Sequence, residues 1–466
     1  MNELVAQSAT EVVALLRRGE IAPREAVAAA VERIEAVDSS VNALPIRCFD
    51  RALAQAEGAF DRDDPRSLCG LPIAVKDYND VGGVRTTYGS PIFANHVPVR
   101  SDATVARLEE HGAIPVAKSN VPEWAGGHTF NPVLGLTRNP WDRSLSAGGS
   151  SGGSAAALAT GQVWLATGND LGGSLRTPAS FNGVVGLRPS PGRVPRGQRL
   201  SAFDTLWVEG PMGRCVSDVA LMLDAGAGRH PDDPLSFDAA PVSEVIHQDQ
   251  VPRRMAFSSN LNIVPMHREI AAVCEQSASQ FAGLGVDISD DIPDFAGAVG
   301  CFQTLRAVLV ATMMGDMLEA HRARIAPEIV DNIERGFAVT PHDLFDAERV
   351  RWALSKQMTD FFKHHDLLIC PATSISPFPV ETRYVEEIDG QKCETYIDWF
   401  AITFALTLTS CPVISIPCGV TADGLPVGMQ LVGPPRGEAT LLRAARQLES
   451  IVQFTPRLPI TPDFGT

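Results

Sequence analysis

The chain has 466 residues, of which 45% are hydrophobic and 20% charged, and its formal net charge is −16. This composition is typical of a folded globular protein and excludes an intrinsically disordered chain. The acidic balance argues against a nucleic-acid-binding surface, so we expect no nucleic-acid partner. It places no limit on a small neutral substrate.

The nine cysteines form no CxxC pair and have no histidine nearby at zinc-ligand spacing. Several of them lie in apolar runs, where a free cysteine behaves as a small buried hydrophobe. The first residues lack the basic and apolar regions of a signal peptide. We therefore expect a cytoplasmic protein that needs neither a metal nor a cofactor.

The first elements predicted are helices, and residues 1–60 read as a helical N-terminal wrapper without chemistry. Ser8 or Thr10 can cap a helix that ends near Gly19. Pro23 can open the next helix, and a third is predicted over residues 49–60.

Two apolar runs, residues 70–77 and 113–119, predict buried strands that end near Lys76 and Lys118. A helix predicted over residues 104–111 separates them. A strand, a helix and a second strand at this spacing predict a parallel pair. The chain contains only five lysines, so we do not expect a lysine inside an apolar run to be an ordinary surface residue.

The most unusual stretch follows, with two glycine clusters that each frame a serine. Ser150 lies in the sequence GGSSGG at residues 148–153, and Ser174 follows Gly172 and Gly173. Glycine weakens regular structure, so dense clusters indicate a backbone that approaches another group closely. The successive amides of residues 171–174 can point N–H groups at one oxyanion.

The remainder alternates helices and strands, which predicts the α/β class. Residues 183–199 read as a loop, and residues 231–250 as an acidic surface excursion. No charge occurs between Asp398 and Asp423, but two prolines interrupt this stretch, so we expect a buried helix and strand there and no membrane span. Further helices are predicted over residues 217–226, 267–281, 302–324, 343–364 and 439–451, and strands over residues 254–258, 366–371, 413–416 and 428–432.

Three chemistries are candidates for the glycine-framed serines. Neither a phosphate-binding GxxxxGK[ST] loop nor a GxGxxG fingerprint is present. Residues 148–152 match the GxSxG pattern of a nucleophile elbow. That elbow follows a hydrophobic strand, whereas the preceding residues 137–143 are typical of a turn. A serine activated by a buried neutral lysine fits better, and on these residues alone either Lys76 or Lys118 could be that base.

Three motifs together resemble the amidase signature family. They are GLPIAVKD at residues 70–77, GGSSGGSA at 148–155 and GNDLGGSLRTPA at 168–179, and the likeness extends from about residue 5 to 450. The resemblance implies a single compact α/β domain over residues 1–466, with a mixed central sheet covered by helices and a catalytic core over residues 66–200.

The same resemblance implies residue roles. Ser174 is the nucleophile, Ser150 is a bridging serine that follows a cis peptide from Gly149, and Lys76 is the base. Lys118 becomes structural. The resemblance also implies an oxyanion hole and an acyl-side wall, formed respectively by the amides of Leu171, Gly172, Gly173 and Ser174 and by the loop that contains Ala125 and Gly126.

The expected activity is amide hydrolysis through an acyl-enzyme, with aryl amides, carbamates and esters also accessible. The small residues at 125–127 suggest room for a bulky group, and the region 302–400 is expected to shape the leaving-group side with Phe302, Met313, Met314 and Trp399. The partner is a small amide-type substrate, with the chain acting alone or as a homodimer.

Two alternatives stay open. One is the A-type subunit of a tRNA-dependent glutamine amidotransferase, which residues 186–192 disfavour because they lack that subunit's usual Lys-Pro-Thr-Tyr-Gly pattern. The other is a non-catalytic binding protein on the same fold. A second departure from the family is Asn169, where many members carry serine or threonine; we expect it to have little effect because it flanks the motif.

Overall fold

One mixed sheet runs through the computed structural model, which describes residues 2–197, 200–248, 250–452, 454 and 458–462. In these residues the sheet has eleven strands. Their spatial order is β1 (Ile46–Arg47), β3 (Ile114–Ser119), β2 (Pro72–Lys76), β6 (Leu165–Asp170), β8 (Val208–Gly213), β7 (Val185–Arg188), β14 (Val413–Val420), β15 (Pro426–Val432), β11 (Leu367–Pro371), β9 (Arg254–Phe257) and β10 (Asp287–Ser289).

The sheet is parallel near its two ends and antiparallel in between. Strands β3, β2 and β6 are mutually parallel, as are β11, β9 and β10. The strands from β6 through β8, β7, β14 and β15 to β11 pair antiparallel. The predicted parallel pair, the α/β class and the single domain with a mixed sheet are confirmed.

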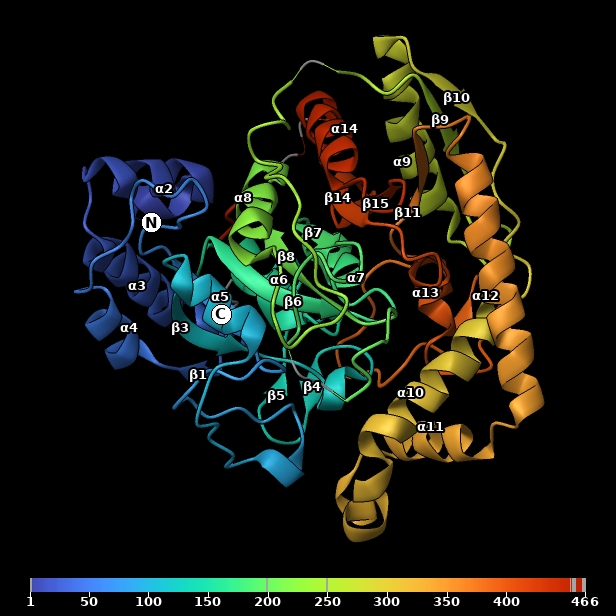
Figure 1. Cartoon of the computed structure of the whole chain (residues 1–466), viewed down its shortest axis with the longest axis horizontal. Helices are drawn as coiled ribbons and strands as arrows, with labels where there is room; N and C mark the ends of the chain where they lie inside the picture. Colours follow the sequence, from blue (N-terminus) through green and yellow to red (C-terminus); the bar gives the residue numbers. More distant parts are fainter. Residues whose placement is uncertain (1, 198–199, 249, 453, 455–457, 463–466) are drawn as a thin grey trace.

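Helices cover both faces of this sheet (Figure 1). One face packs against α2 (Ala9–Arg18), α5 (Ala103–Glu110), α8 (Val216–Gly226), α9 (Arg268–Ser279) and α14 (Glu438–Val452). The other packs against α3 (Pro23–Val41), α4 (Phe49–Gln55), α6 (Gly152–Ala159), α7 (Arg176–Asn182) and α13 (Ala401–Thr407). The short pieces are α1 (Glu3–Ala6), β4 (Phe130–Asn131), β5 (Gly135–Leu136), β12 (Glu387–Ile388), β13 (Gln391–Lys392) and the 3-10 turns η1 (Pro91–Phe93), η2 (Glu123–Ala125), η3 (Gln280–Leu284), η4 (Arg322–Arg324) and η5 (Asp398–Phe400).

The N-terminal helices follow their capping residues. Ser8 caps α2 in a capping box with Glu11, and Gly19 ends that helix in the left-handed conformation at φ 70°. Pro23 is the first residue of α3, as predicted. Helix α4 ends at Gln55, earlier than the predicted residue 60.

The prediction of a loop over residues 183–199 is wrong for β7, which is a central strand of the sheet. The described residues that follow it, 189–197, form neither helix nor strand. The sequence of β7 reads as a loop because it contains glycine and is followed by proline. Gly186 is required there, since an added Cβ would lie 2.3 Å from the Leu175 carbonyl oxygen. Strands β6 and β8 were missed for a similar reason, because they contain Gly168, Asn169, Asp170 and Pro211, which are poor strand formers.

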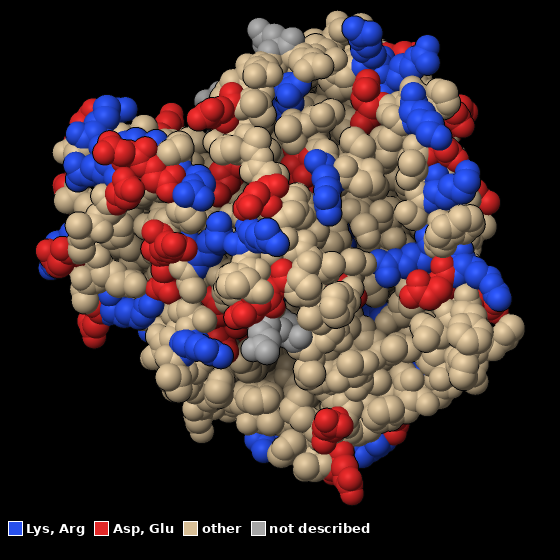
Figure 2. Space-filling model, viewed as in Figure 1, with Lys and Arg blue, Asp and Glu red and all other residues tan. Residues whose placement is uncertain are grey.

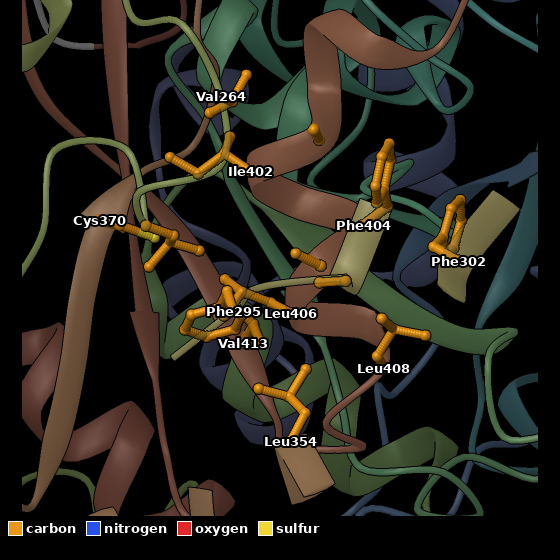
Figure 3. Packing of buried hydrophobic residues seen from close by; sticks show 14 of the residues in the cluster. Val264, Phe295, Phe302, Leu354, Cys370, Ile402, Phe404, Leu406, Leu408 and Val413 are labelled. Carbon is orange, nitrogen blue, oxygen red and sulfur yellow. The ribbon is translucent and has the colours of Figure 1, made fainter. Parts of the chain in front are cut away.

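Three long helices, α10 (Ala298–His321), α11 (Pro327–Ala338) and α12 (Pro341–Phe361), flank the sheet on one side (Figure 1). The segment Ala298–Arg324 is long and apolar enough to cross a membrane, but half of its apolar window is buried in the protein, as in a core helix. Figure 3 shows Phe302 of α10 beside Phe404 of α13, and these rings stack with centroids 4.3 Å apart. The uncharged stretch after Asp398 forms α13 and β14, as predicted.

Acidic and basic side chains are interspersed on the molecular face shown in Figure 2, without a large region of one sign. Of residues 231–250, the described part forms turns and neither helix nor strand.

Gly153 tests whether close backbone packing explains the glycine clusters. A Cβ at this position would lie 2.3 Å from the Asn120 nitrogen and 2.7 Å from the Ala43 carbonyl oxygen. Because both atoms belong to the backbone, we expect Gly153→Ala to lower the free energy of unfolding by at least about 2 kcal/mol, measured by urea denaturation. Gly283→Ala is the matched control, since nothing lies within 4 Å of its added Cβ. Equal urea midpoints for the two variants would contradict this explanation.

Candidate active site

The parallel strands β2 and β6 bring Lys76 to the carboxyl edge of the sheet. Lys76 is the last residue of β2, and its backbone N–H donates to Thr167 Oγ1 of β6 at 2.9 Å. Alternate residues of a strand face the same side. Lys76 therefore shares a face with Ala74, which packs in the core cluster that contains α6. The lysine side chain is thus directed toward the start of α6, and Ser150 lies just before that helix.

Among the described residues, the amino group of Lys76 forms hydrogen bonds with three neutral oxygens. Its Nζ lies 2.7 Å from Ser150 Oγ, 2.9 Å from Ser151 Oγ and 2.6 Å from Asn169 Oδ1. The side chain is completely buried. Burial lowers the pKa of Lys76 to about 7, although the more distant charges of Glu209 and Asp170 oppose the shift. A substantial fraction of this amine is therefore neutral near pH 7.

Asn169 contacts Lys76, so the reason for expecting little effect from it, that it merely flanks the motif, is wrong; the small effect of asparagine at this position stays a prediction. Asn169 ends β6 one residue before Asp170, and its carbonyl oxygen accepts directly from Lys76. Ser151 was also missed as a lysine partner. Neither contact could be predicted from local sequence, because Asn169 and Ser151 reach Lys76 only through the pairing of β2 with β6 and the position of the start of α6.

Lys118, the other candidate base, is held by a carboxylate. Its Nζ forms an ion pair with Asp77 Oδ1 at 2.9 Å and donates to Thr86 Oγ1 at 2.7 Å. All three residues are fully buried. This arrangement is typical of a lysine that joins segments of the fold.

The loop that carries Ser150 is shaped by close backbone contacts. The Gly149–Ser150 peptide is cis. A Cβ at Gly149 would lie 2.4 Å from the Gly127 carbonyl oxygen, and one at Gly152 would lie 2.3 Å from Thr129 Oγ1. The Ser151 N–H donates to the Ser174 carbonyl oxygen at 3.3 Å, which joins the two serine-bearing loops.

Asp170 anchors the turn that carries Ser174. Its carboxylate accepts from both Nε and Nη2 of Arg176, and Arg188 lies 3.3 Å from it. Burial alone would raise the pKa of Asp170, but the two arginines hold it well below its usual range. Arg176 also donates to the Thr403 carbonyl and to Gln430, so the turn is tied to the C-terminal half of the chain.

The predicted nest of four amides is wrong at Gly173. Its N–H donates to Asp170 Oδ1 at 2.9 Å, which makes it unavailable to a substrate oxygen. The N–H groups of Gly172 and Ser174 donate to no acceptor in the part of the chain that the structure describes. Gly173 is still required for the turn, because its φ is 127° and an added Cβ would lie 2.3 Å from Thr403 Oγ1.

Ser174 lines a pocket. Most of the wall is apolar or aromatic, and it includes the predicted residues Leu171, Gly172, Gly173, Ala125, Gly126, Phe302, Met313 and Met314. The small residues of the 125–127 loop do not all leave free space. A Cβ at Gly126 would lie 2.5 Å from Ile329 Cδ1, so this glycine accommodates a wall residue.

Trp399, expected beside these residues, lines a neighbouring cavity instead. The two cavities share Gly126, Gly127 and Ile329 in their walls.

The described residues contain no group of three or more histidine, cysteine, aspartate or glutamate side chains placed to hold a metal ion. All nine cysteines are free, and Cys274 and Cys418 approach to 3.8 Å between their sulfur atoms.

Known proteins similar to this chain share its fold and its length. The Amidase family model matches residues 25–442. An acylamidase of Rhodococcus erythropolis is 32% identical over 97% of both chains, and the A-type subunit of the glutamyl-tRNA(Gln) amidotransferase of Moorella thermoacetica is 33% identical over 98% of this chain and 99% of its own. The structure of 6-aminohexanoate cyclic dimer hydrolase with its substrate superposes with a TM-score of 0.89 at 27% identity, covering 98% of this chain and 100% of that one. The chain therefore belongs to the amidase signature family and is an enzyme that acts on C–N bonds.

Proposed function

We propose that the protein hydrolyses carboxylic amides through an acyl-enzyme on Ser174, with Ser150 and Lys76 as a proton relay. The observation that carries the proposal is the buried Lys76 amine, which contacts Ser150 Oγ at 2.7 Å and whose pKa burial lowers to about 7. A lysine can act as a base only when it is neutral.

The contacts of Lys76 suit that role. A neutral amine has two N–H groups and one lone pair. If the N–H groups donate to Ser151 Oγ and Asn169 Oδ1, the lone pair faces the remaining neighbour, Ser150 Oγ. The Ser150 hydroxyl can then donate its proton to Lys76 and accept another in its place.

In the first step, Ser174 Oγ attacks the amide carbonyl and forms a C–O bond. Its proton passes to Ser150, and the proton of Ser150 passes to Lys76. The carbonyl electron pair becomes an oxyanion, which the N–H groups of Gly172 and Ser174 are placed to hold.

In the second step, the oxyanion collapses and the C–N bond breaks. The leaving nitrogen takes a proton from Ser150, which is replaced by the proton on Lys76. Water then attacks the acyl-enzyme through the same relay, which releases the carboxylic acid and restores Ser174. Carbamates and esters contain carbonyls that the same steps can cleave.

The wall of the Ser174 pocket favours an acyl or aryl group of some bulk, because Phe302, Met313, Met314 and Trp124 line it. The similarity to an acylamidase and to an aryl acylamidase structure (TM-score 0.89, 25% identity, 97% of both chains) supports this class of substrate.

The A-type subunit of an amidotransferase is the second candidate, favoured by the identity to the Moorella thermoacetica protein. That function requires partner subunits and glutamine as the amide donor. Purification of the chain from its own host, followed by a glutaminase assay, distinguishes the two functions. Co-purifying partner subunits and activity specific for glutamine support the amidotransferase. Activity of the isolated chain on simple amides supports the hydrolase.

Ser174→Ala should lower kcat by at least about 10³-fold for amide substrates, because it removes the nucleophile. The measurement is steady-state hydrolysis, with a fluorophosphonate adduct located by mass spectrometry. Ser150→Ala is the comparison, since it removes the relay but leaves Ser174 available for labelling. An adduct on Ser150 in the wild type, or near-wild-type turnover by Ser174→Ala, would refute the assignment.

The pH dependence of kcat/KM should follow Lys76. The neutral amine is the active form, and its fraction increases as pH rises through the pKa of about 7. We therefore expect kcat/KM to rise about tenfold per pH unit below this value and to level off above it. Lys76→Arg should be inactive, because arginine stays charged. A profile without an ionisation between pH 6 and 8 would be inconsistent with Lys76 as the base.

Asn169→Asp should move that ionisation upward. A carboxylate at the position of Asn169 Oδ1, 2.6 Å from Nζ, favours the ammonium form. We expect the midpoint of the profile to rise by about 1 to 3 pH units. Asn169→Ser is the neutral control and should leave the midpoint within about half a unit of the wild type. An unchanged midpoint in folded Asn169→Asp would show that Asn169 does not act on Lys76.

A further inference from the structure

Arg306 is distinctive in the pocket that contains Ser174. Among the described residues that line this pocket, it alone carries a formal charge. Its neighbours in the wall are apolar, aromatic or uncharged polar residues, and Arg306 itself is only 7% exposed. A guanidinium in such a wall has little water to solvate it, so its partners determine what it can bind.

The position of Arg306 along α10 relates it to the reacting centre. Phe302, one turn earlier in α10, packs against Gly172, where an added Cβ would lie 3.2 Å from the Phe302 ring. Four residues of helix rise about 6 Å. Arg306 therefore lies about one helical turn from Phe302, the side chain that contacts the turn with Gly172 and Ser174.

The protein partners of Arg306 are neutral. Its Nη1 donates to Asn332 Oδ1 at 2.9 Å, and its Nη2 donates to the hydroxyl of Tyr396. The guanidinium also lies over the Tyr396 ring, 5.3 Å from the centroid. Within the described residues Arg306 forms no ion pair, unlike the buried Arg176 and Arg188, which both pair with Asp170.

Asp398, close in sequence to Tyr396, is engaged elsewhere. Its Oδ2 accepts from the N–H groups of Glu394 and Thr395, and its Oδ1 accepts from the Thr395 hydroxyl and the Gln303 amide. The nearby carboxylate therefore serves to hold its own loop.

A buried charge without a counter-charge is costly, and a planar guanidinium matches a carboxylate through two parallel hydrogen bonds. We propose that the preferred amide substrate of this enzyme carries a carboxylate, which binds Arg306 while the scissile carbonyl lies at Ser174. The inference builds on the proposed function, because it places the substrate in the same pocket. The carboxylate can belong to the acyl half or to the amine half of the amide.

Binding to Ser174→Ala tests the inference without relying on turnover. For the acyl half, the probes are the 4-nitroanilide of glutaric acid and its neutral methyl ester. For the amine half, they are N-acetyl-4-aminobenzoate and its neutral amide. Calorimetry should show at least tenfold tighter binding, about the effect of one charge-assisted hydrogen bond, for the anion of one pair.

Adding Arg306→Gln should remove that preference, and Arg306→Lys should retain part of it. Arg349→Gln is the matched control, since Arg349 is an exposed arginine that pairs with Asp346 on α12. It should leave the ratio of anion to neutral affinities unchanged. Kinetics of the wild type and Arg306→Gln on the same pairs should show the change in ratio mainly in KM.

Two results would overturn the inference. One is equal binding of anion and neutral probe in both pairs. The other is an equal loss for both members of a pair in Arg306→Gln, which would mean that Arg306 only holds Asn332 and Tyr396. Failure of the proposed function looks different, because Ser174→Ala would then hydrolyse these amides at the wild-type rate.

Discussion

The chemistry proposed for this protein depends on one amine that is buried and kept away from carboxylates. Lys76 and Lys118 end adjacent parallel strands, and both side chains are completely buried. Within the part of the chain that the structure describes, Lys118 pairs with the carboxylate of Asp77, whereas Lys76 Nζ forms hydrogen bonds with neutral oxygens. Desolvation therefore lowers the pKa of Lys76 without a contact ion pair to oppose it. The two lysines therefore differ in their hydrogen-bond partners, which come from neighbouring segments of the chain.

The surrounding fold holds that amine and the Ser174 turn in register. The acidic residue nearest in sequence to the turn, Asp170, pairs with Arg176 and Arg188, and through Arg176 it is joined to residues of the C-terminal half. Glycines allow the backbone segments to approach, as Gly149 does against the Gly127 carbonyl. The proposed substrate pocket and the proposed proton relay thus share one edge of the sheet, and residues of α10 line the pocket.

Much of this arrangement could be predicted from the sequence, and the misses have physical causes. The capping residues of α2, the proline that opens α3 and the apolar strands β2 and β3 carry local signals that the structure bears out. Strand β6 carries glycine, asparagine and aspartate, so tertiary contacts decide its conformation. Asn169 and Lys76 are 93 positions apart in the chain, so the sequence around either residue does not predict their contact. The family resemblance, and no spacing rule, favoured Lys76 over Lys118.

Direct titration of the Lys76 amine tests the central claim. The chain contains only five lysines, so protein labelled with ¹³C at lysine Cε gives a simple NMR spectrum, in which Lys76→Met identifies the Lys76 signal. The account predicts that this signal titrates near pH 7 in the folded, substrate-free enzyme. A Lys76 signal that titrates near pH 10.4, the ordinary value of a solvated lysine, would contradict it.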